Sequence, residues 1–356
     1  MPRHPPQRPS QATVARVLGI STATVSNTFN RPERVSAEVR ERVLAESARQ
    51  GYAGPDPAAR QLSRGRTDTL GLLLTDELPY AFSDPAAVAF IQGLAASCSG
   101  AGLNLLLISA ESSGDRSSAV GNAAVDGFVV YSVRDDDPHL KQILDRNLPT
   151  VVVDAPRDVP GVDWVGPDDR EGARALAQVL VDLGHRRIGI ITAGMSGTRY
   201  SGAAEDHRAL LGSDSVNRNR ILGFHDALAT VGVTDLPVEE RPVNTEAAGA
   251  EALDALLDRR PDLTAVCALM DVMALGALEA ARARGLAVPA QLTVTGYDDI
   301  PQAAAAGLTT VSQPLLDKGR VAGELYLSHR PGEEPRRRTL PTHVQARATS
   351  GPPRVD

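Results

Sequence analysis

The chain has 356 residues, of which 42% are hydrophobic and 23% charged, and its formal net charge is −7. This length fits two or three domains, and the apolar fraction excludes a disordered or collagen-like chain. The two cysteines, Cys98 and Cys267, lie far apart in apolar surroundings, so we expect neither a disulfide framework nor a zinc site. The N-terminus lacks an apolar signal region and no apolar run reaches about 18 residues. We therefore predict a cytoplasmic protein that does not enter a membrane.

Charge is divided unevenly along the chain. Residues 1–66 contain 11 arginines and five acidic residues, a balance of +6, whereas residues 67–356 carry a balance of −13. A basic segment joined to an acidic body is typical of a polyanion-binding module attached to a domain with another task, because phosphate contacts supply the sequence-independent part of DNA affinity. On charge alone, an ordinary solvated surface is the alternative.

Three short helices are predicted near the N-terminus. The first begins after Ser10 and reaches Val17, the second begins at Ser21, and the third runs from Ser36 to a stop at Gly51. Serine caps a helix start and glycine permits a helix end, which fixes these bounds. The apolar positions expected to face inward are Val14, Val17, Val25, Phe29, Val39 and Val43.

The spacing within this segment is that of a helix-turn-helix. Ala15 is the small residue where two helices cross, Gly19 lies in the turn, and Val25 is the apolar anchor of the second helix. The side chains expected to point outward from the second helix are Thr22, Ala23, Ser26 and Asn27. Small polar side chains on an exposed helix can hydrogen-bond base edges and phosphates in the major groove. We predict a DNA-binding head; a purely structural three-helix bundle is the alternative.

A linker follows the head. Residues 54–67 are rich in proline, arginine and glycine. Asp56 and Pro57 can begin one short helical turn, but a helix of about eight residues is marginal alone in water. We expect this segment to need a partner before it orders.

Strands and helices alternate from residue 69 onward. Short apolar runs divided by helices are typical of parallel strands buried on both faces. The predicted strands are TLGLLLTD, LNLLLIS, GFVVYS, TVVVD, RIGIIT, TAVCA and LTVTG, with a final strand after Pro341, and the predicted helices are 85–100, 140–146, 170–183, 220–231, 247–259 and 272–284. The pattern indicates two doubly wound α/β halves. Residues 194–217 are predicted to form a mobile Gly/Ser-rich loop at the mouth of the cleft.

Polar residues follow the predicted strands. They include Tyr131, Asp154, Asp271 and Asp298, and in such sheets ligands bind beyond the carboxyl ends of the strands. Turn chemistry alone also explains each carboxylate taken singly, but their convergence from both halves favours a site. Carboxylates and guanidinium groups with few aromatic side chains suit a polyhydroxyl ligand.

The sequence shows no machinery for catalysis. No GxGxxG follows a strand, and the sequence contains neither GxxxxGK[ST] nor GxSxG. Its seven histidines include no pair with the spacing of a zinc site. We therefore expect no cofactor, no metal and no enzymatic activity.

The head carries a family resemblance over its full length. TVARVLGISTATVSNTFNRPERVSAEVRERVLAESARQGY resembles the DNA-binding head of the lactose-repressor (LacI/GalR) family of bacterial transcription regulators. The resemblance implies a recognition helix in which Thr22, Ala23 and Asn27 read bases. It also implies backbone contacts and a hinge helix that wedges a leucine into the minor groove. The implied DNA-binding residues are Ser21, Thr22, Ala23, Thr24, Ser26, Asn27, Asn30, Arg34, Ser36, Ala59 and Leu62. Many members have arginine where Asn27 stands, and asparagine suits an adenine edge better.

The resemblance extends into the body. VVVDAP, RNRILGF, MDVMALGALEAARARGLAVP and LTVTGYDDIP resemble the effector domain of the same family. It implies an N-terminal all-α helix-turn-helix head and an α/β effector domain of the periplasmic-binding-protein-like type I fold, with two doubly wound parallel-sheet subdomains. Arg220 would stand just before its helix. The implied effector-binding residues are Arg220, Asp271 and Asp298, with Phe82, Asp84, Tyr131 and Asn244 weaker by position. Met270 replaces a frequent asparagine.

We predict five segments: a disordered tail at 1–9, the head at 10–53, a hinge at 54–68, the effector and dimerisation domain at 69–347 and a disordered tail at 348–356. Residues 331–356 show no heptad repeat, so a homodimer that reads a palindromic double-stranded operator is expected. The predicted function is a repressor of carbohydrate-utilisation genes with a small sugar effector. The alternatives are a regulator that needs a non-sugar metabolite as corepressor and, from a different class, a soluble sugar-binding protein.

Overall fold

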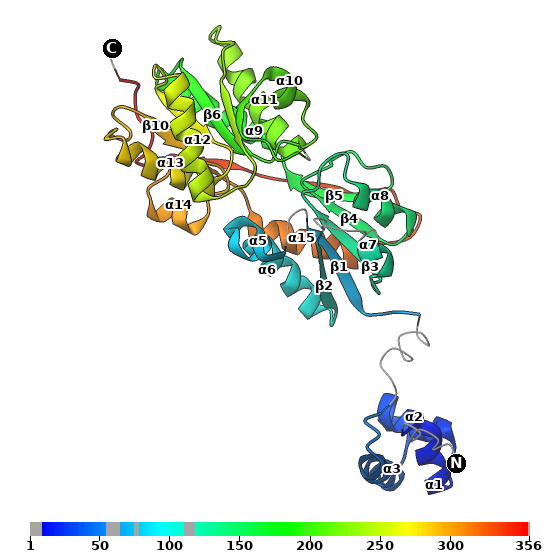
Figure 1. The fold of residues 1–356 in the computed structure, drawn as a ribbon. Coiled ribbons are helices and arrows are strands. Elements are labelled where there is room, and N and C mark those ends of the chain that lie inside the picture. Colours follow the sequence, from blue (N-terminus) through cyan, green and yellow to red (C-terminus); the bar gives the residue numbers. More distant parts are fainter. Residues whose placement is uncertain (1–8, 55–64, 75–77, 110–117, 197, 355–356) are drawn as a thin grey trace, which may run out of the picture. The chain divides into compact units, whose positions relative to one another are not determined.

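The computed structural model describes residues 9–54, 65–74, 78–109, 118–196 and 198–354 (Figure 1). The chain divides into two compact units, Met1–Thr67 and Asp68–Asp356. The hinge residues Ala59 and Leu62 lie outside the described residues, so their predicted roles stay predictions. No helix among the described residues is both long and apolar enough to cross a membrane.

Three α-helices and one short 3-10 helix form the described part of the smaller unit. They are α1 (Gln11–Leu18), α2 (Thr22–Asn30), η1 (Pro32–Arg34) and α3 (Ala37–Gln50). The hydroxyls of Ser10, Ser21 and Ser36 accept backbone N–H groups three residues ahead and cap the three α-helices. Gly19 and Gly51 end α1 and α3 in the left-handed region, with φ of +64° and +71°. The predicted helix starts and stops are therefore confirmed.

The core of this unit contains the predicted crossing and anchor residues. Val14, Ala15, Val25 and Val43 are buried, and the ring of Phe29 packs edge-on against Tyr52 with the centroids 5.7 Å apart. The prediction that Val17 faces inward is wrong, because its side chain is 56% exposed. The inner face of α1 is formed by residues 14, 15 and 18, and residue 17 lies more than a quarter-turn from the centre of that face.

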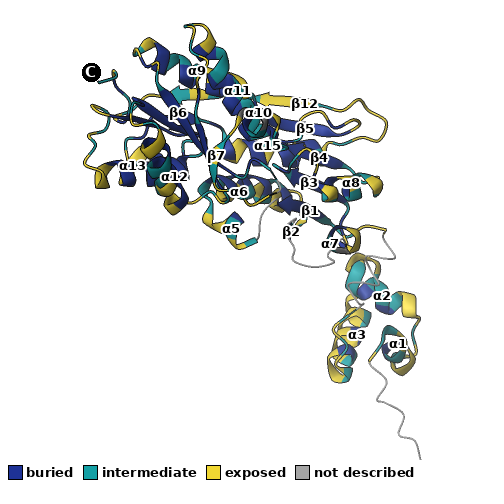
Figure 2. Ribbon diagram, turned by 45° about the horizontal axis from the view of Figure 1, so that its top comes forward, coloured by how far each residue is buried: buried dark blue, intermediate teal, exposed yellow. Residues whose placement is uncertain are grey.

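The larger unit has a first lobe built on a six-stranded parallel sheet of order β12-β5-β4-β3-β1-β2. Its strands are β1 (Thr69–Leu74), β2 (Asn104–Ser109), β3 (Gly127–Tyr131), β4 (Thr150–Val153), β5 (Asp163–Pro167) and β12 (Arg337–Leu340). Its helices are α5 (Leu78–Ser83), α6 (Pro85–Gly100), α7 (Ser118–Asn122), α8 (Pro138–Asp145) and α15 (Leu315–Leu327). Figure 2 shows the inner strands buried and the edge strand β12 largely exposed.

The second lobe has a five-stranded sheet of order β10-β9-β6-β8-β7, parallel except for β7. Its strands are β6 (Ile188–Ala193), β7 (Gly202–Ala204), β8 (Val238–Arg241), β9 (Ala265–Ala268) and β10 (Thr293–Thr295). Its helices are α9 (Asp169–Asp182), α10 (Asp206–Leu211), α11 (Ser215–Ala229), α12 (Glu246–Arg259), α13 (Asp271–Ala283) and α14 (Pro301–Ala305). The predicted pair of α/β halves is confirmed.

The chain passes between the lobes more than once. It leaves the first lobe after β5, returns to it for α15 and β12, and ends in the second lobe. There β13 (His343–Gln345), the predicted last strand, pairs antiparallel with β11 (Thr310–Ser312). The prediction of a loop over 194–217 is wrong, because that segment contains β7, α10 and the first turn of α11.

The end of the described chain is also ordered, against our prediction of a disordered tail at 348–356. The Val294 N–H donates to the Thr349 carbonyl at 3.0 Å. The Gly351 carbonyl lies 2.8 Å from Nε2 of buried His185 and 3.2 Å from the Thr293 hydroxyl. Polar side chains that are buried need partners, and here the tail backbone supplies them.

Helices α6 and α15 pack so closely that glycine is required between them. A Cβ added at Gly93 would lie far inside van der Waals distance of the Leu316 carbonyl oxygen, whereas a Cβ at Gly100, on the same helix, would meet nothing within 4 Å. We expect Gly93→Ala to lower the free energy of unfolding by about 1–3 kcal/mol, and Gly100→Ala to be neutral or mildly stabilising. Urea unfolding followed by circular dichroism measures both; equal values for the two variants would contradict the close packing.

Candidate functional site

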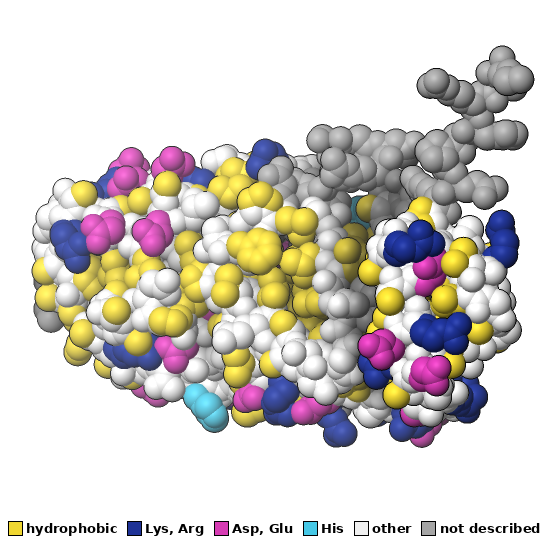
Figure 3. Space-filling view, turned by 90° about the horizontal axis from the view of Figure 1, so that it is seen from below, with side chains coloured by type: hydrophobic (Ala, Val, Ile, Leu, Met, Phe, Trp, Pro, Cys, Tyr) yellow, Lys and Arg dark blue, Asp and Glu magenta, His cyan; other side chains and the backbone are white. Residues whose placement is uncertain are grey.

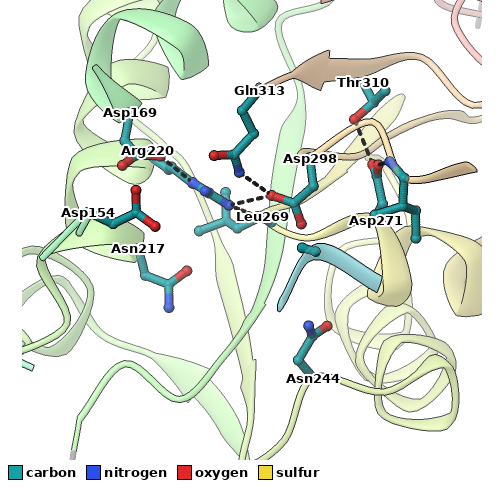
Figure 4. Close-up of polar contacts among 12 residues, drawn as sticks. Asp154, Asp169, Asn217, Arg220, Asn244, Leu269, Asp271, Asp298, Thr310 and Gln313 are labelled. Carbon is teal, nitrogen blue, oxygen red and sulfur yellow. Dashed lines mark hydrogen bonds and ion pairs between the residues drawn. The ribbon is translucent and has the colours of Figure 1, made fainter. Parts of the chain in front are cut away.

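A cavity of about 380 Å³ lies at the carboxyl ends of the strands of both lobes. Figure 4 shows Asp154 and Asn217 on one side of this space, and Asp298 and Asn244 on the other. The described residues that line it include four carboxylates and four cations: Asp84, Asp154, Asp214, Asp298, Arg134, Arg199, Arg220 and Lys318. A concave site with a few converging polar groups is typical of small-molecule binding.

The wall from the first lobe is formed where strands β3 and β4 and helix α6 meet the cavity. Tyr131 ends β3, and its ring stacks on Phe90 of α6 with the centroids 4.1 Å apart. Asp154 follows β4 with a left-handed φ of +61°, and Asp84 caps α6 by accepting the Ala86 N–H at 3.1 Å. Burial raises the pKa of both carboxyls, and nearby Lys318 opposes the increase.

Arg220 is the centre of the wall from the second lobe. Its Nε donates to Asp169 Oδ1 at 2.8 Å, its Nη1 donates to the Leu269 carbonyl at 2.5 Å, and the same Nη1 lies 3.5 Å from Asp298 Oδ1. The guanidinium also lies 3.7 Å from the centre of the Tyr297 ring. The side chain is only 6% exposed, so these partners fix its position. Arg220 lies in the second turn of α11, which begins at Ser215, whereas we predicted that this helix begins at or just after residue 220.

Asp298 completes this wall. It has a φ of +120°, and its Oδ1 accepts Gln313 Nε2 at 2.6 Å. Burial raises the pKa of Asp298 to about 7, while Arg220 acts in the opposite direction. Asp214 also lines the cavity and caps α11 through the Asn217 N–H; burial raises its pKa to about 6. The cavity therefore holds carboxylates whose charge is costly unless a partner is present.

Asp271 does not line the cavity, which changes the role implied by the resemblance. Its carboxylate is fully buried and accepts the Thr310 hydroxyl at 2.6 Å and the Ile300 N–H at 3.0 Å. Burial, and then the charge of Asp298, raises its pKa well above the usual value. The neighbouring Met270 reaches the cavity instead. Through these contacts Asp271 holds the segment that carries Asp298, and its implied role in effector binding stays a prediction.

The remaining predicted residues divide in the same way. Tyr131, Asp84 and Asn244 line the cavity, and Asn244 donates to the Tyr80 hydroxyl at 2.9 Å. Phe82 does not: its side chain is 61% exposed and lies outside the lining. The sequence analysis missed Lys318, Gln313, Asn217, Asp214, Arg134 and Arg199. The first two lie in a helix and a crossing segment far along the chain from any predicted strand end.

The smaller unit presents the predicted recognition helix α2. Thr22 and Ala23 are exposed, and Asn27 is half-buried. The hydroxyls of Ser21 and Ser36 each accept a backbone N–H as helix caps. Either hydroxyl would have to contact a phosphate while it keeps this hydrogen bond. Three further predicted contact residues lie in this unit. The Thr24 N–H donates to the Ser21 hydroxyl at 3.0 Å, Asn30 donates to the Ser26 hydroxyl at 3.2 Å, and Arg34 is exposed.

Comparison with known proteins agrees with this architecture. The family model described as a periplasmic binding protein-like domain matches residues 177–350. The HTH-type transcriptional regulator Rv3575c of Mycobacterium tuberculosis (strain ATCC 25618 / H37Rv) is 44% identical over 98% of this chain and 99% of its own length.

Two solved structures extend the likeness. A LacI-family transcriptional regulator from Corynebacterium glutamicum is 37% identical, with a TM-score of 0.73 over 95% of this chain and 98% of its own. The complex of the transcriptional regulator CelR with cellobiose is 30% identical, with a TM-score of 0.69 over 96% of this chain and 100% of its own. Sequence and fold agree over almost the whole length, and the chain belongs to the LacI/GalR family of transcriptional regulators.

Proposed function

We propose that the chain is a cytoplasmic, homodimeric repressor whose affinity for a palindromic operator is controlled by a sugar bound between the lobes. The observation that carries the effector part is the pairing of Arg220 with Asp169 and Asp298 on the cavity wall. A fixed guanidinium beside a carboxylate offers donors and acceptors to adjacent hydroxyls. The CelR structure, solved with cellobiose, supports a sugar as the ligand class.

An apolar surface supports the dimer. Five large apolar side chains are exposed on elements of the first lobe that contact one another, α5, α6, β2 and α15: Phe82, Val88, Leu106, Leu316 and Leu327. Figure 3 shows apolar side chains gathered on one face of the larger unit. Contiguous exposed apolar surface marks an interaction site, and a second copy of the chain would also bring a second head to the operator. We therefore propose that Phe82 is part of this surface, which its 61% exposure supports.

Control of DNA binding follows from linkage. The effector alters operator affinity only as far as it prefers one arrangement of the lobes, and the operator must disfavour the effector by the same factor. The chain crosses between the lobes after β5, β11 and β12, and β1 of the first lobe directly follows the linker. A change of the angle between the lobes would therefore move β1, and the linker attached to it, relative to the second lobe.

The proposal is tested by selecting genomic fragments with the purified full-length chain and then adding glucose, cellobiose, ribose or nucleobases to the recovered complexes. Recovery of a palindrome that one sugar releases is the expected result. A palindrome that binds only with a nucleobase present would instead establish a corepressor, and recovery of no site at low salt would contradict a DNA-binding head.

In the head, Asn27 and Arg34 are expected to act differently. Asn27→Ala should reduce discrimination at one operator base pair by about 1–3 kcal/mol, because it removes a base contact. Arg34→Ala should weaken all sequences alike and lower the salt slope by about 1, because it removes a phosphate contact. Fluorescence anisotropy against operator and single-base variants measures both.

The control for these head variants is Arg49→Ala, because Glu46 already holds that guanidinium at 2.6 Å. It should change neither the discrimination nor the salt slope. Uniform weakening by Asn27→Ala would contradict its role in base reading.

For the effector site we expect Arg220→Lys to raise the sugar concentration needed for operator release at least about tenfold. Lysine keeps the charge beside Asp169 but cannot span the Leu269 carbonyl and Asp298 as the planar guanidinium does. The matched control is Arg170→Lys, at a bidentate surface pair with Asp226 outside the cavity. Release curves from the recovered operator measure both variants, and an unchanged curve for Arg220→Lys would place the effector elsewhere.

A further inference from the structure

Strand β8 buries two neighbouring carboxylates. The side chains of Glu239 and Glu240 are 2% and 0% exposed, and successive residues of a strand point to opposite faces of the sheet. Glu239 pairs with Arg259 of α12. Glu240 points the other way and pairs with Arg208 of α10. A buried carboxylate is costly unless it is paired and hydrogen-bonded, so the partners of Glu240 indicate which part of the molecule it holds.

These partners come from the segment between β6 and α11, whose described residues 194–196 and 198–213 we call the arm. The Oε1 atom of Glu240 accepts the Met195 N–H at 3.0 Å and Arg208 Nη2 at 3.0 Å, and its Oε2 accepts Arg208 Nε. A carboxylate that accepts two donors of one guanidinium fixes its orientation as well as its position. Glu240 thus joins the start of the arm to α10, near its end.

Arg208 holds the middle of the arm. Its Nη1 and Nη2 atoms lie 3.5 Å from Thr198 Oγ1, and its guanidinium lies 4.1 Å from the centre of the Tyr200 ring. A guanidinium over an aromatic face is attracted to it. The Arg208 side chain is only 18% exposed. The position of this part of the arm therefore depends on the place where Glu240 holds Arg208.

The arm lines the cavity and contacts the other lobe. Thr198 and Arg199 are among the residues that line the cavity. At the end of the arm, the Ser213 carbonyl accepts the N–H of Asp135 at 2.9 Å, and Asp135 follows β3 in the first lobe. The same Asp135 accepts Arg218 of α11 through Oδ2 at 2.9 Å. The arm is therefore in contact with the cavity and with both lobes.

We propose that Glu240 and Arg208 are positioning residues of the effector site. They hold the arm where Thr198 and Arg199 line the cavity and where the end of the arm contacts the first lobe. Neither Glu240 nor Arg208 is among the described residues of the lining, so both act on a ligand through the arm. The inference rests on the proposed function and deepens it, because it places control of the effector response outside the cavity.

Fluorine-labelled tyrosine reports the position of the arm without any ligand. The chain has six tyrosines, and in the full chain labelled with 3-fluorotyrosine the variant Tyr200→Phe assigns the signal of the arm. In Glu240→Gln the amide NH₂ group faces an N–H donor in either orientation, so the contact with Arg208 is lost. We expect the Tyr200 ¹⁹F signal to move or broaden in Glu240→Gln. It should stay unchanged in the matched control Glu239→Gln, whose partner lies on the opposite face of the sheet.

Operator release measures the consequence for the effector. Glucose, cellobiose and ribose are added in turn to complexes of each variant with the recovered operator. For the sugar that releases the wild type, we expect Glu240→Gln to raise the concentration at half-release at least about fivefold. Glu239→Gln should remain within about twofold of the wild type, because its partners are independent of the arm.

A double-mutant cycle with Arg199→Ala separates positioning from a general loss of packing. Arg199→Ala should by itself raise the sugar concentration at half-release, because it removes a side chain that the arm brings to the cavity. If Glu240 acts through the arm, the double variant responds like Glu240→Gln alone, whereas independent effects multiply. An unshifted curve for Arg199→Ala, or effects that multiply, overturns the inference.

The remaining outcomes separate this inference from the proposed function. Should Glu240→Gln fail to fold, Arg208→Lys replaces it in every measurement, because lysine keeps the charge but cannot donate to the carboxylate from two nitrogens. An unmoved Tyr200 signal, or equal release curves for Glu239→Gln and Glu240→Gln, overturns the positioning role and leaves the repressor intact. A wild type that no sugar releases overturns the proposed effector class and this inference together.

Discussion

In the cavity, Lys318 joins Asp154 of the first lobe to Gln313 in the segment that crosses between the lobes. Gln313 in turn donates to Asp298 of the second lobe, which faces Arg220. A buried charge is tolerated only when it is paired and hydrogen-bonded. Charged groups of the two lobes are therefore linked through Lys318 and Gln313. A ligand that contacts these residues would act on both lobes at once.

The same contacts connect the cavity to the surface that we propose for the dimer. Asp84 lines the cavity and caps α6, and α6 carries the exposed Val88 one turn further along. Helix α15, which holds Lys318, packs against α6 through glycine at close approach. Interiors packed in this way move as rigid pieces and not by continuous deformation. We infer that a shift at a bound ligand would reach the apolar face through these two helices.

Sequence patterns predicted the parts of this molecule that rest on local chemistry. Serine caps, Gly19 and the apolar runs of the central strands follow rules of hydrogen bonding and burial, and they appear where predicted. The sequence did not indicate strand β8, because three of its four buried residues are charged: Glu239, Glu240 and Arg241. Their burial depends on ion pairs with residues far along the chain, such as Arg208 and Arg259, which periodicity cannot reveal. Lys318 was missed for the same reason.

Backbone conformation explains how the site can hold its shape before a ligand arrives. Ser132, Asp154 and Asp298 have φ of +49°, +61° and +120° at the cavity, a region that side chains other than glycine adopt at a cost. That cost persists only where the surrounding packing fixes the backbone, and here each of these residues follows or adjoins a buried strand. Because the acceptors are oriented in advance, ligand binding spends little free energy on ordering them. More of the binding free energy then remains to favour one angle between the lobes. In a linked system, operator affinity depends on this angle.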